Sequence, residues 1–240
     1  MTLSWIPLGA GQHLVRVSGM VFEALCAARQ RRHAQPLSHS ALEITVAAGR
    51  FTIEMAPIPD THGQLRGVVA EGPVGTRWAG RFRVFRYEIR RWRDGVIPDA
   101  RHATSTVVVG VDVAGAERLL DLVPSVPTAV WGRDELDAGE MWNSNSVTSW
   151  LLARSRFDTS HLVPPAGGRA PGWRAGLIVA ARAVAGCVDP TIAGDQCNNG
   201  PDVESRPVHD HWRTSVDTDD ATCADDEVER PRHDELRPRR

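Results

Sequence analysis

The amino-acid sequence predicts an α+β domain with a mainly antiparallel sheet flanked by helices. Two patterns support this fold class. Apolar residues recur at helical spacing between His13 and Arg32, and apolar and polar residues alternate on both sides of a turn at residues 47–50. The first pattern is typical of an amphipathic helix and the second of a β-hairpin. Because the strands of a hairpin run antiparallel, the sheet is expected to be mainly antiparallel.

The first predicted element is the helix between His13 and Arg32. Arginines gather toward its C-terminal end, where positive charge interacts favourably with the helix dipole. The apolar positions that define its buried side are Leu14, Val17, Val21, Phe22, Leu25 and Cys26. We therefore expect an amphipathic helix that flanks the sheet.

The hairpin follows this helix, and its alternation assigns each side chain to one face. Pairing Ala47 with Arg50 places Glu43 opposite Glu54. One face then carries His39, Ala41, Glu43, Thr52, Glu54 and Ala56, and the other carries Leu42, Ile44, Val46, Phe51, Ile53 and Met55. The second of these faces is apolar and is expected to cover the core.

Three more strands and two more helices are predicted further along the chain. β-branched and aromatic residues indicate strands at Gly67–Glu71, Arg81–Trp92 and Ser105–Asp112. Helical periodicity indicates a helix at Val113–Leu122, which Pro124 ends, and another at Ser144–Arg154.

The chain is predicted to consist of one domain and a tail. Residues 1–186 carry 21 basic and 16 acidic side chains, whereas residues 187–240 carry 7 and 14. The periodicity stops after Gly186, and polar residues dominate from there to Arg240. Such a composition buries too little apolar surface to offset chain entropy, so residues 187–240 are expected to form a disordered acidic tail.

Several classes of site and partner are not expected. The four cysteines are widely separated and include no Cys-x-x-Cys pair, which favours reduced thiols in a cytoplasmic protein. His209-Asp210-His211 lies in the acidic tail and is interpreted as a solvated linker. Gly9-Ala10-Gly11 lacks the third glycine of a dinucleotide-binding loop, so neither a metal nor another cofactor is predicted.

Nucleic acid and a membrane span are not predicted either. The arginine-rich strand at residues 81–92 has Phe and Trp among its arginines, a combination found in nucleic-acid binding, but Glu88 and Asp94 disfavour that interpretation. The longest late apolar stretch, Ala175 to Ala185, is interrupted by Arg182 and is too short to cross a bilayer. The oligomeric state is left open.

The candidate site is a polar cluster, Asn143-Ser144-Asn145-Ser146, that leads directly into the last predicted helix. A serine in the first turn of a helix lies beside unpaired backbone N–H groups, which can stabilise an oxyanion. Serine also needs a base, and His39 is the candidate, with Glu54 or Glu43 as the group that orients it. Trp142 is either a lid or a packing residue. In the simpler alternative, Asn143 and Ser144 are only helix caps and the two glutamates are only solvated.

Two segments resemble motifs of a known family. Ser38-His39-Ser40-Ala41-Leu42-Glu43-Ile44 and Asn143-Ser144-Asn145-Ser146-Val147 are similar to the His and nucleophile motifs of the circularly permuted papain-like fold. This group includes permuted NlpC-type peptidases and lecithin:retinol acyltransferase-like enzymes, in which the strand histidine precedes the nucleophile. The resemblance covers roughly residues 10 to 160. It departs from the family at position 144, where serine replaces the usual cysteine, as in an uncharacterised bacterial family with a similar Asn-Ser-Asn-Ser/Thr stretch.

The resemblance implies an acyl hydrolase or transferase that acts on an amide or ester bond. Ser144 would be the nucleophile and His39 the general base, and their side chains are expected to be in direct or one-water contact. Asn143, Asn145, Ser146 and Trp142 would bind a small-molecule, peptide or lipid substrate. The alternative is a papain-like binding module that keeps the cleft and has lost the chemistry.

Overall fold

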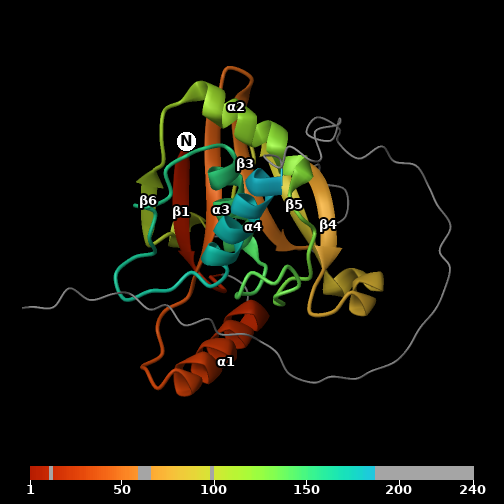
Figure 1. The fold of residues 1–240 in the computed structure, drawn as a ribbon, viewed down its shortest axis with the longest axis vertical. Helices are drawn as coiled ribbons and strands as arrows, with labels where there is room; N and C mark the ends of the chain where they lie inside the picture. Colours follow the sequence, from red (N-terminus) through yellow and green to blue (C-terminus); the bar gives the residue numbers. More distant parts are fainter. Residues whose placement is uncertain (11–12, 59–65, 98–99, 187–240) are drawn as a thin grey trace, which may run out of the picture.

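The computed structural model describes residues 1–10, 13–58, 66–97 and 100–186, and these residues form an α+β fold (Figure 1). Six strands build one sheet, in the order β4-β5-β3-β2-β1-β6, and every neighbouring pair is antiparallel. The strands are β1 (Thr2–Pro7), β2 (Ser38–Val46), β3 (Gly49–Pro57), β4 (Val68–Pro73), β5 (Arg86–Arg93) and β6 (Ser105–Val108). The predicted fold class is thus confirmed at the level of α+β with an antiparallel sheet.

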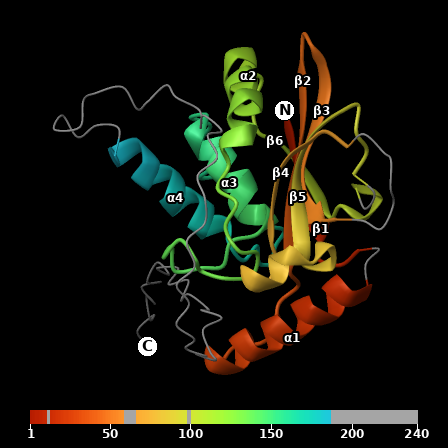
Figure 2. The ribbon, with the colours of Figure 1, turned by 90° about the vertical axis from the view of Figure 1, so that its right-hand side faces the viewer.

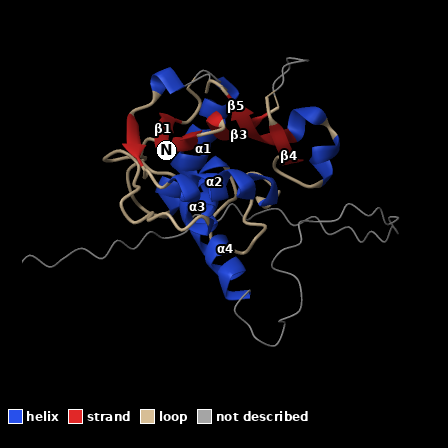
Figure 3. Ribbon diagram, turned by 90° about the horizontal axis from the view of Figure 1, so that it is seen from above, coloured by secondary structure: helices blue, strands red, loops and turns tan. Residues whose placement is uncertain are grey.

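Four α-helices are present among the described residues: α1 (His13–Arg29), α2 (Val113–Leu122), α3 (Ser144–Arg154) and α4 (Trp173–Gly186). Figures 2 and 3 show that α2, α3 and α4 lie on one face of the sheet. Helix α1 lies apart from them, at the lower end of the molecule in Figures 1 and 2. Short 3₁₀ turns occur at η1 (Trp78–Arg81), η2 (Arg83–Phe85), η3 (Ala100–His102) and η4 (Val123–Ser125).

The main core lies between the sheet and the three helices. Leu42, Ile44, Ile53 and Met55 point into it from β2 and β3, and we call their side of the sheet the helical face. Helix α3 is central, because its nine residues from Ser144 to Leu152 are all buried. A helix that is covered on every side needs partners all around it, and here the sheet, α2 and α4 supply them.

The hairpin formed by β2 and β3 is confirmed, but its register is not the predicted one. Val46 pairs with Gly49, so Glu43 lies opposite Thr52 rather than Glu54. The difference is two residues. Because side chains alternate with a period of two, this shift leaves every side chain on its predicted face.

Other boundaries also differ from the predictions. The first helix ends at Arg29, and Arg31 adopts a left-handed conformation with φ of 52°. The strand predicted from Arg81 begins only at Arg86, because residues 78–81 form η1 and residues 83–85 form η2. Strand β1 and helix α4 were not predicted. The expected disordered tail, residues 187–240, lies outside the described residues.

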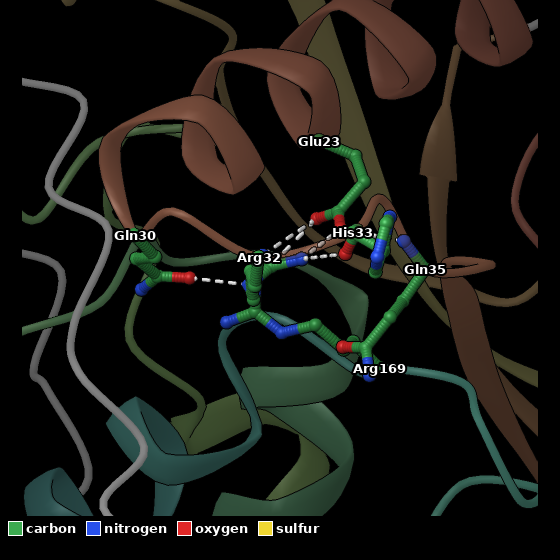
Figure 4. A network of polar contacts seen from close by, with 6 residues as sticks. All are labelled: Glu23, Gln30, Arg32, His33, Gln35 and Arg169. Carbon is green, nitrogen blue, oxygen red and sulfur yellow. Dashed lines mark hydrogen bonds and ion pairs between the residues drawn. The ribbon is translucent and has the colours of Figure 1, made fainter.

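A buried carboxylate of helix α1 binds residues outside the helix (Figure 4). Glu23 accepts hydrogen bonds from the Arg32 guanidinium and, at 2.8 Å, from the backbone N–H of Gln35. Arg169 forms an ion pair with it at 3.4 Å. Burial raises the pKa of Glu23, but the hydrogen bond from Arg32 and the contacts with Gln35 and Arg169 outweigh burial, so the pKa is lowered.

Cys26, on the same side of α1, is buried and disulfide-bonded. The expectation of reduced thiols is therefore wrong for this residue, and the other three cysteines lie outside the described residues. Among the helices of the described residues, none has an apolar stretch of the length that a bilayer crossing requires.

Candidate active site

The polar cluster before α3 forms a reciprocal cap at the start of that helix. Asn143 Oδ1 accepts hydrogen bonds from the backbone N–H of Asn145 at 2.9 Å and of Ser146 at 3.3 Å. In return, Ser146 Oγ accepts a hydrogen bond from the backbone N–H of Asn143 at 3.1 Å. This is a capping box, and it stabilises the helix start. It also occupies two of the backbone N–H groups in the first turn of α3 and leaves the N–H of Ser144 for an oxyanion.

The same residues bind the segment that leads into α4. Ser146 Oγ donates to the carbonyl of Gly172 at 2.7 Å, and Asn143 Nδ2 donates to the carbonyl of Pro171 at 2.9 Å. The N–H of Gly172 donates to Glu140 at 2.8 Å. Gly172 has a φ of 84°, and a Cβ at this position would lie 2.6 Å from Asn143 Oδ1. Only glycine fits here without displacing the cap.

Asn145 joins the start of α3 to the start of β2. Its Nδ2 donates to the carbonyls of Ser38 and Pro171, both at 2.9 Å. Its Oδ1 is buried without a hydrogen-bond partner among the described residues. The two motifs that the sequence analysis singled out are therefore neighbours in space, although more than a hundred residues separate them. The direct contact is made by Asn145.

Ser144 differs from its neighbours in the cluster. It is the first residue of α3 and only 5% exposed. Asn143, Asn145 and Ser146 all use their side chains to hold the local structure. In the described part of the chain, no hydrogen bond involves the Ser144 hydroxyl. Of the four side chains in the cluster, Ser144 is the one that makes no hydrogen bond within the described part of the chain.

His39 is half-buried near the start of β2, where it pairs with Ile6 of β1. Side chains alternate along a strand, so Ser40 points to the helical face and His39 points to the opposite one. The packing agrees with this assignment: Ile6 clusters with Ala41 and Ile97, away from the main core. Ser144 and His39 thus approach the start of β2 from opposite faces of the sheet.

The register distinguishes the two glutamates proposed to orient His39. Glu43 lies four positions further along β2, about 13 Å away at the rise of a strand, and it pairs with Arg50 at 3.4 Å. Glu54 falls opposite Ala41 when the pairing of Leu42 with Ile53 is extended by one step. It is therefore a diagonal neighbour of His39 on the same face. Glu54 is the better placed of the two.

Glu54 belongs to a buried charged network that the sequence analysis missed. Arg90 of β5 pairs with Glu54 at 3.1 Å and with Glu88 at 2.5 Å, and Arg66 pairs with Glu88 at 2.8 Å. We call this side of the sheet the charged face. Burial raises the pKa of Glu88, but the hydrogen bond from Arg66 and the charge of Arg90 outweigh it, so the pKa is lowered. The alternation of Arg and Glu in β5 was the available signal.

Trp142 is a core residue in this structure. It is 1% exposed, and its backbone bridges to Trp131. This placement agrees with the packing alternative for Trp142 and not with a lid. In the residues that the structure describes, no group of three or more His, Cys, Asp or Glu side chains is arranged to hold a metal ion.

Comparisons with protein-family models, with curated proteins and with solved structures found no match to this chain.

Proposed function

We propose that this protein is an acyl hydrolase or transferase of the permuted papain-like type, with Ser144 as its nucleophile. The observation that carries the proposal is the contrast within the polar cluster. Three of its side chains are committed to hydrogen bonds that fix the start of α3, and the fourth is a hydroxyl that makes no hydrogen bond to the described residues. Structural capping alone requires Asn143 and Ser146, and it does not require a serine at position 144.

Each step of the proposed reaction has a candidate residue. Ser144 Oγ attacks the carbonyl carbon of an ester or amide while its proton passes to His39. The imidazolium then gives this proton to the leaving alcohol or amine, and water or another acceptor releases the acyl group. The N–H of Ser144 and the positive end of the α3 dipole stabilise the oxyanion. Glu54 orients His39 and stabilises its charged form.

The proposal requires His39 to reach Ser144 around the start of β2. His39 points to the face of the sheet opposite to Ser144, so this contact requires the first residues of β2 to move when substrate binds. The substrate would be a small molecule, a peptide or a lipid with an ester or amide bond.

A second candidate function is that of a binding module without catalysis. One observation favours it: Asn143 Oδ1 occupies the N–H groups of Asn145 and Ser146, so a single backbone donor remains for an oxyanion. The loss of one oxyanion donor costs an enzyme about 10²–10³ in rate. In this case the site would hold a carbonyl-containing ligand and leave it intact.

Labelling with a serine-directed fluorophosphonate tests catalysis. We expect the probe to modify Ser144 and not Ser146, as located by mass spectrometry of the digested protein. His39→Ala should abolish the labelling, because it removes the base that activates the hydroxyl. The matched control is His161→Ala. His161 is exposed and lies far from His39 in the sequence, so this variant should leave labelling unchanged. Equal labelling of both variants would exclude His39 as the base.

The variant Ser144→Cys separates the enzyme from the binding module. A thiol at the start of α3 should react faster with iodoacetamide than the exposed control Ser125→Cys, and His39→Ala should remove the difference. If wild type resists the probe and Ser144→Cys reacts quickly, the binding module is favoured. If Ser144→Cys reacts no faster than Ser125→Cys, both functions are contradicted and the cluster is only a helix cap.

A further inference from the structure

Helix α1 exposes apolar side chains where a surface helix normally buries them. Val17, Met20, Val21 and Leu25 follow helical spacing and lie on one side of α1, and Leu25 is 67% exposed. The opposite side holds the buried residues Glu23 and Cys26. These four apolar side chains therefore face away from the protein.

A second exposed apolar segment lies between β4 and β5. Trp78, Phe82, Val84 and Phe85 of η1, η2 and the residue between them are all exposed, and Val84 is 77% exposed. The guanidinium of Arg81 lies 3.7 Å from the centre of the Trp78 ring and 4.6 Å from that of Phe82. Arg81 therefore places a positive charge next to the apolar surface of these two rings.

The two segments lie at the same end of the molecule. In Figures 1 and 2, α1 in red and the short helices in gold occupy the lower end, although about fifty residues separate them in the sequence. Neither segment exposes an acidic residue. The one acid of α1, Glu23, is buried and paired, and residues 77–86 contain none. The exposed arginines are Arg29 and Arg31 at the end of α1, and Arg81 and Arg83 in the second segment, where Arg77 is also exposed but pairs with Glu135.

We propose that this end of the molecule docks on an anionic lipid bilayer. An amphipathic helix with its apolar side outward and arginines at its end is suited to the interface of a membrane. Trp and Phe favour the same region, and arginine is attracted to anionic headgroups. Two apolar segments on separate elements, both bordered by arginine, match a broad and flat negative surface. The full chain has a net charge of −2 and residues 1–186 one of +5, so the attraction comes from the arginines at this end of the molecule. The inference does not depend on chemistry at Ser144.

Sedimentation of the full chain with vesicles tests this docking. We expect binding to vesicles that contain phosphatidylglycerol, much weaker binding to pure phosphatidylcholine vesicles, and a loss of binding at high salt. Leu25→Glu and Val84→Glu should each weaken binding at least about tenfold, because each places a carboxylate in the apolar contact. The matched control Val111→Glu changes a valine that is 89% exposed in the segment between β6 and α2, and it should bind like wild type.

A second readout locates the contact. Brominated phosphatidylglycerol should quench part of the tryptophan fluorescence, and Trp78→Phe should remove most of that quenching. All of these positions are on the surface, so the variants should keep the melting temperature of wild type. The proposal is overturned if wild type does not bind anionic vesicles or if Val84→Glu binds as well as Val111→Glu. It is also overturned if Leu25→Glu and Val84→Glu instead abolish self-association in sedimentation velocity, which would make a second copy of the chain the occupant.

Discussion

The two faces of the sheet are both buried, but they are buried by different chemistry. The helical face packs apolar side chains such as Leu42 and Ile53 against α2, α3 and α4. The charged face carries Glu54, Glu88 and Arg90, each less than 10% exposed. A segment containing Gly95 and Ile97 covers part of it, and Gly95 accepts a hydrogen bond from Thr52 at 2.9 Å.

The difference determines how each face responds to substitution. Apolar packing loses stability in proportion to the volume that is removed, and neighbouring side chains can partly fill the space. A buried ion network is different, because the loss of one member leaves its partners charged and without compensation. The charged face is therefore expected to be more sensitive to a single substitution, even though its net contribution to stability is small.

The largest effect is expected from Arg90→Met. This variant removes the guanidinium that pairs with both Glu54 and Glu88 and leaves two buried carboxylates without it. We expect a loss of about 3–5 kcal/mol in the free energy of unfolding, measured in urea. The triple variant with Glu54→Gln and Glu88→Gln should recover most of that loss. A single variant as stable as wild type would show that solvent reaches this network.

A somewhat smaller effect is expected from Leu42→Ala on the helical face. Leu42 is fully buried in the main core, and its truncation leaves a cavity beneath α3. The expected loss is about 2–4 kcal/mol. Leu42→Met, which conserves volume, should cost less than about 1.5 kcal/mol by the same measurement. If both substitutions cost the same, packing volume would not determine the stability of this face.

The smallest effect is expected from pH, and it should be confined to the charged face. The pKa of Glu88 is lowered from its ordinary value near 4.5, so its charged form stabilises the folded state at neutral pH. This contribution is present above pH 4.5 and is lost as the pH falls through the lower folded-state pKa. Urea unfolding of Glu88→Gln should show a weaker dependence on pH in this acidic range than Leu42→Met shows. Parallel pH profiles for the two variants would contradict the assignment.

The faces of the central hairpin could be predicted from the sequence, but its register could not. Alternation assigns each side chain to a face, and a shift of two residues preserves that assignment. The turn at Ala47-Ala48-Gly49 has no Asn-Gly or Asp-Gly pair to fix the paired residues. The charged network was missed for a related reason, since the pairing of Glu54 with Arg90 depends on how β3 lies against β5.

Helix α4 was not predicted, because it contains a glycine whose reason can be seen only in the folded structure. Gly176 weakens helical propensity. In the structure, a Cβ at this position would lie 2.1 Å from the backbone oxygen of Ser146, so glycine is what lets α4 approach α3. At the candidate site, the polar cluster and its position at a helix start were predicted. The hydrogen bonds that these side chains make could not be predicted. Several of them go to the carbonyls of Pro171 and Gly172, and only the fold brings those two residues close to Asn143, Asn145 and Ser146.

The burial of α3 on every side has a consequence for the protein during its synthesis. The sheet and α2 precede α3 in the chain, but α4, which covers its remaining side, is made afterwards. Until residue 186 has left the ribosome, Trp150 and its neighbours on α3 have an uncovered flank that can bind wrong partners. Ribosome-bound chains that end before Trp173 should therefore be captured by chaperones or cleaved by proteases, whereas chains with α4 outside the ribosome should resist both.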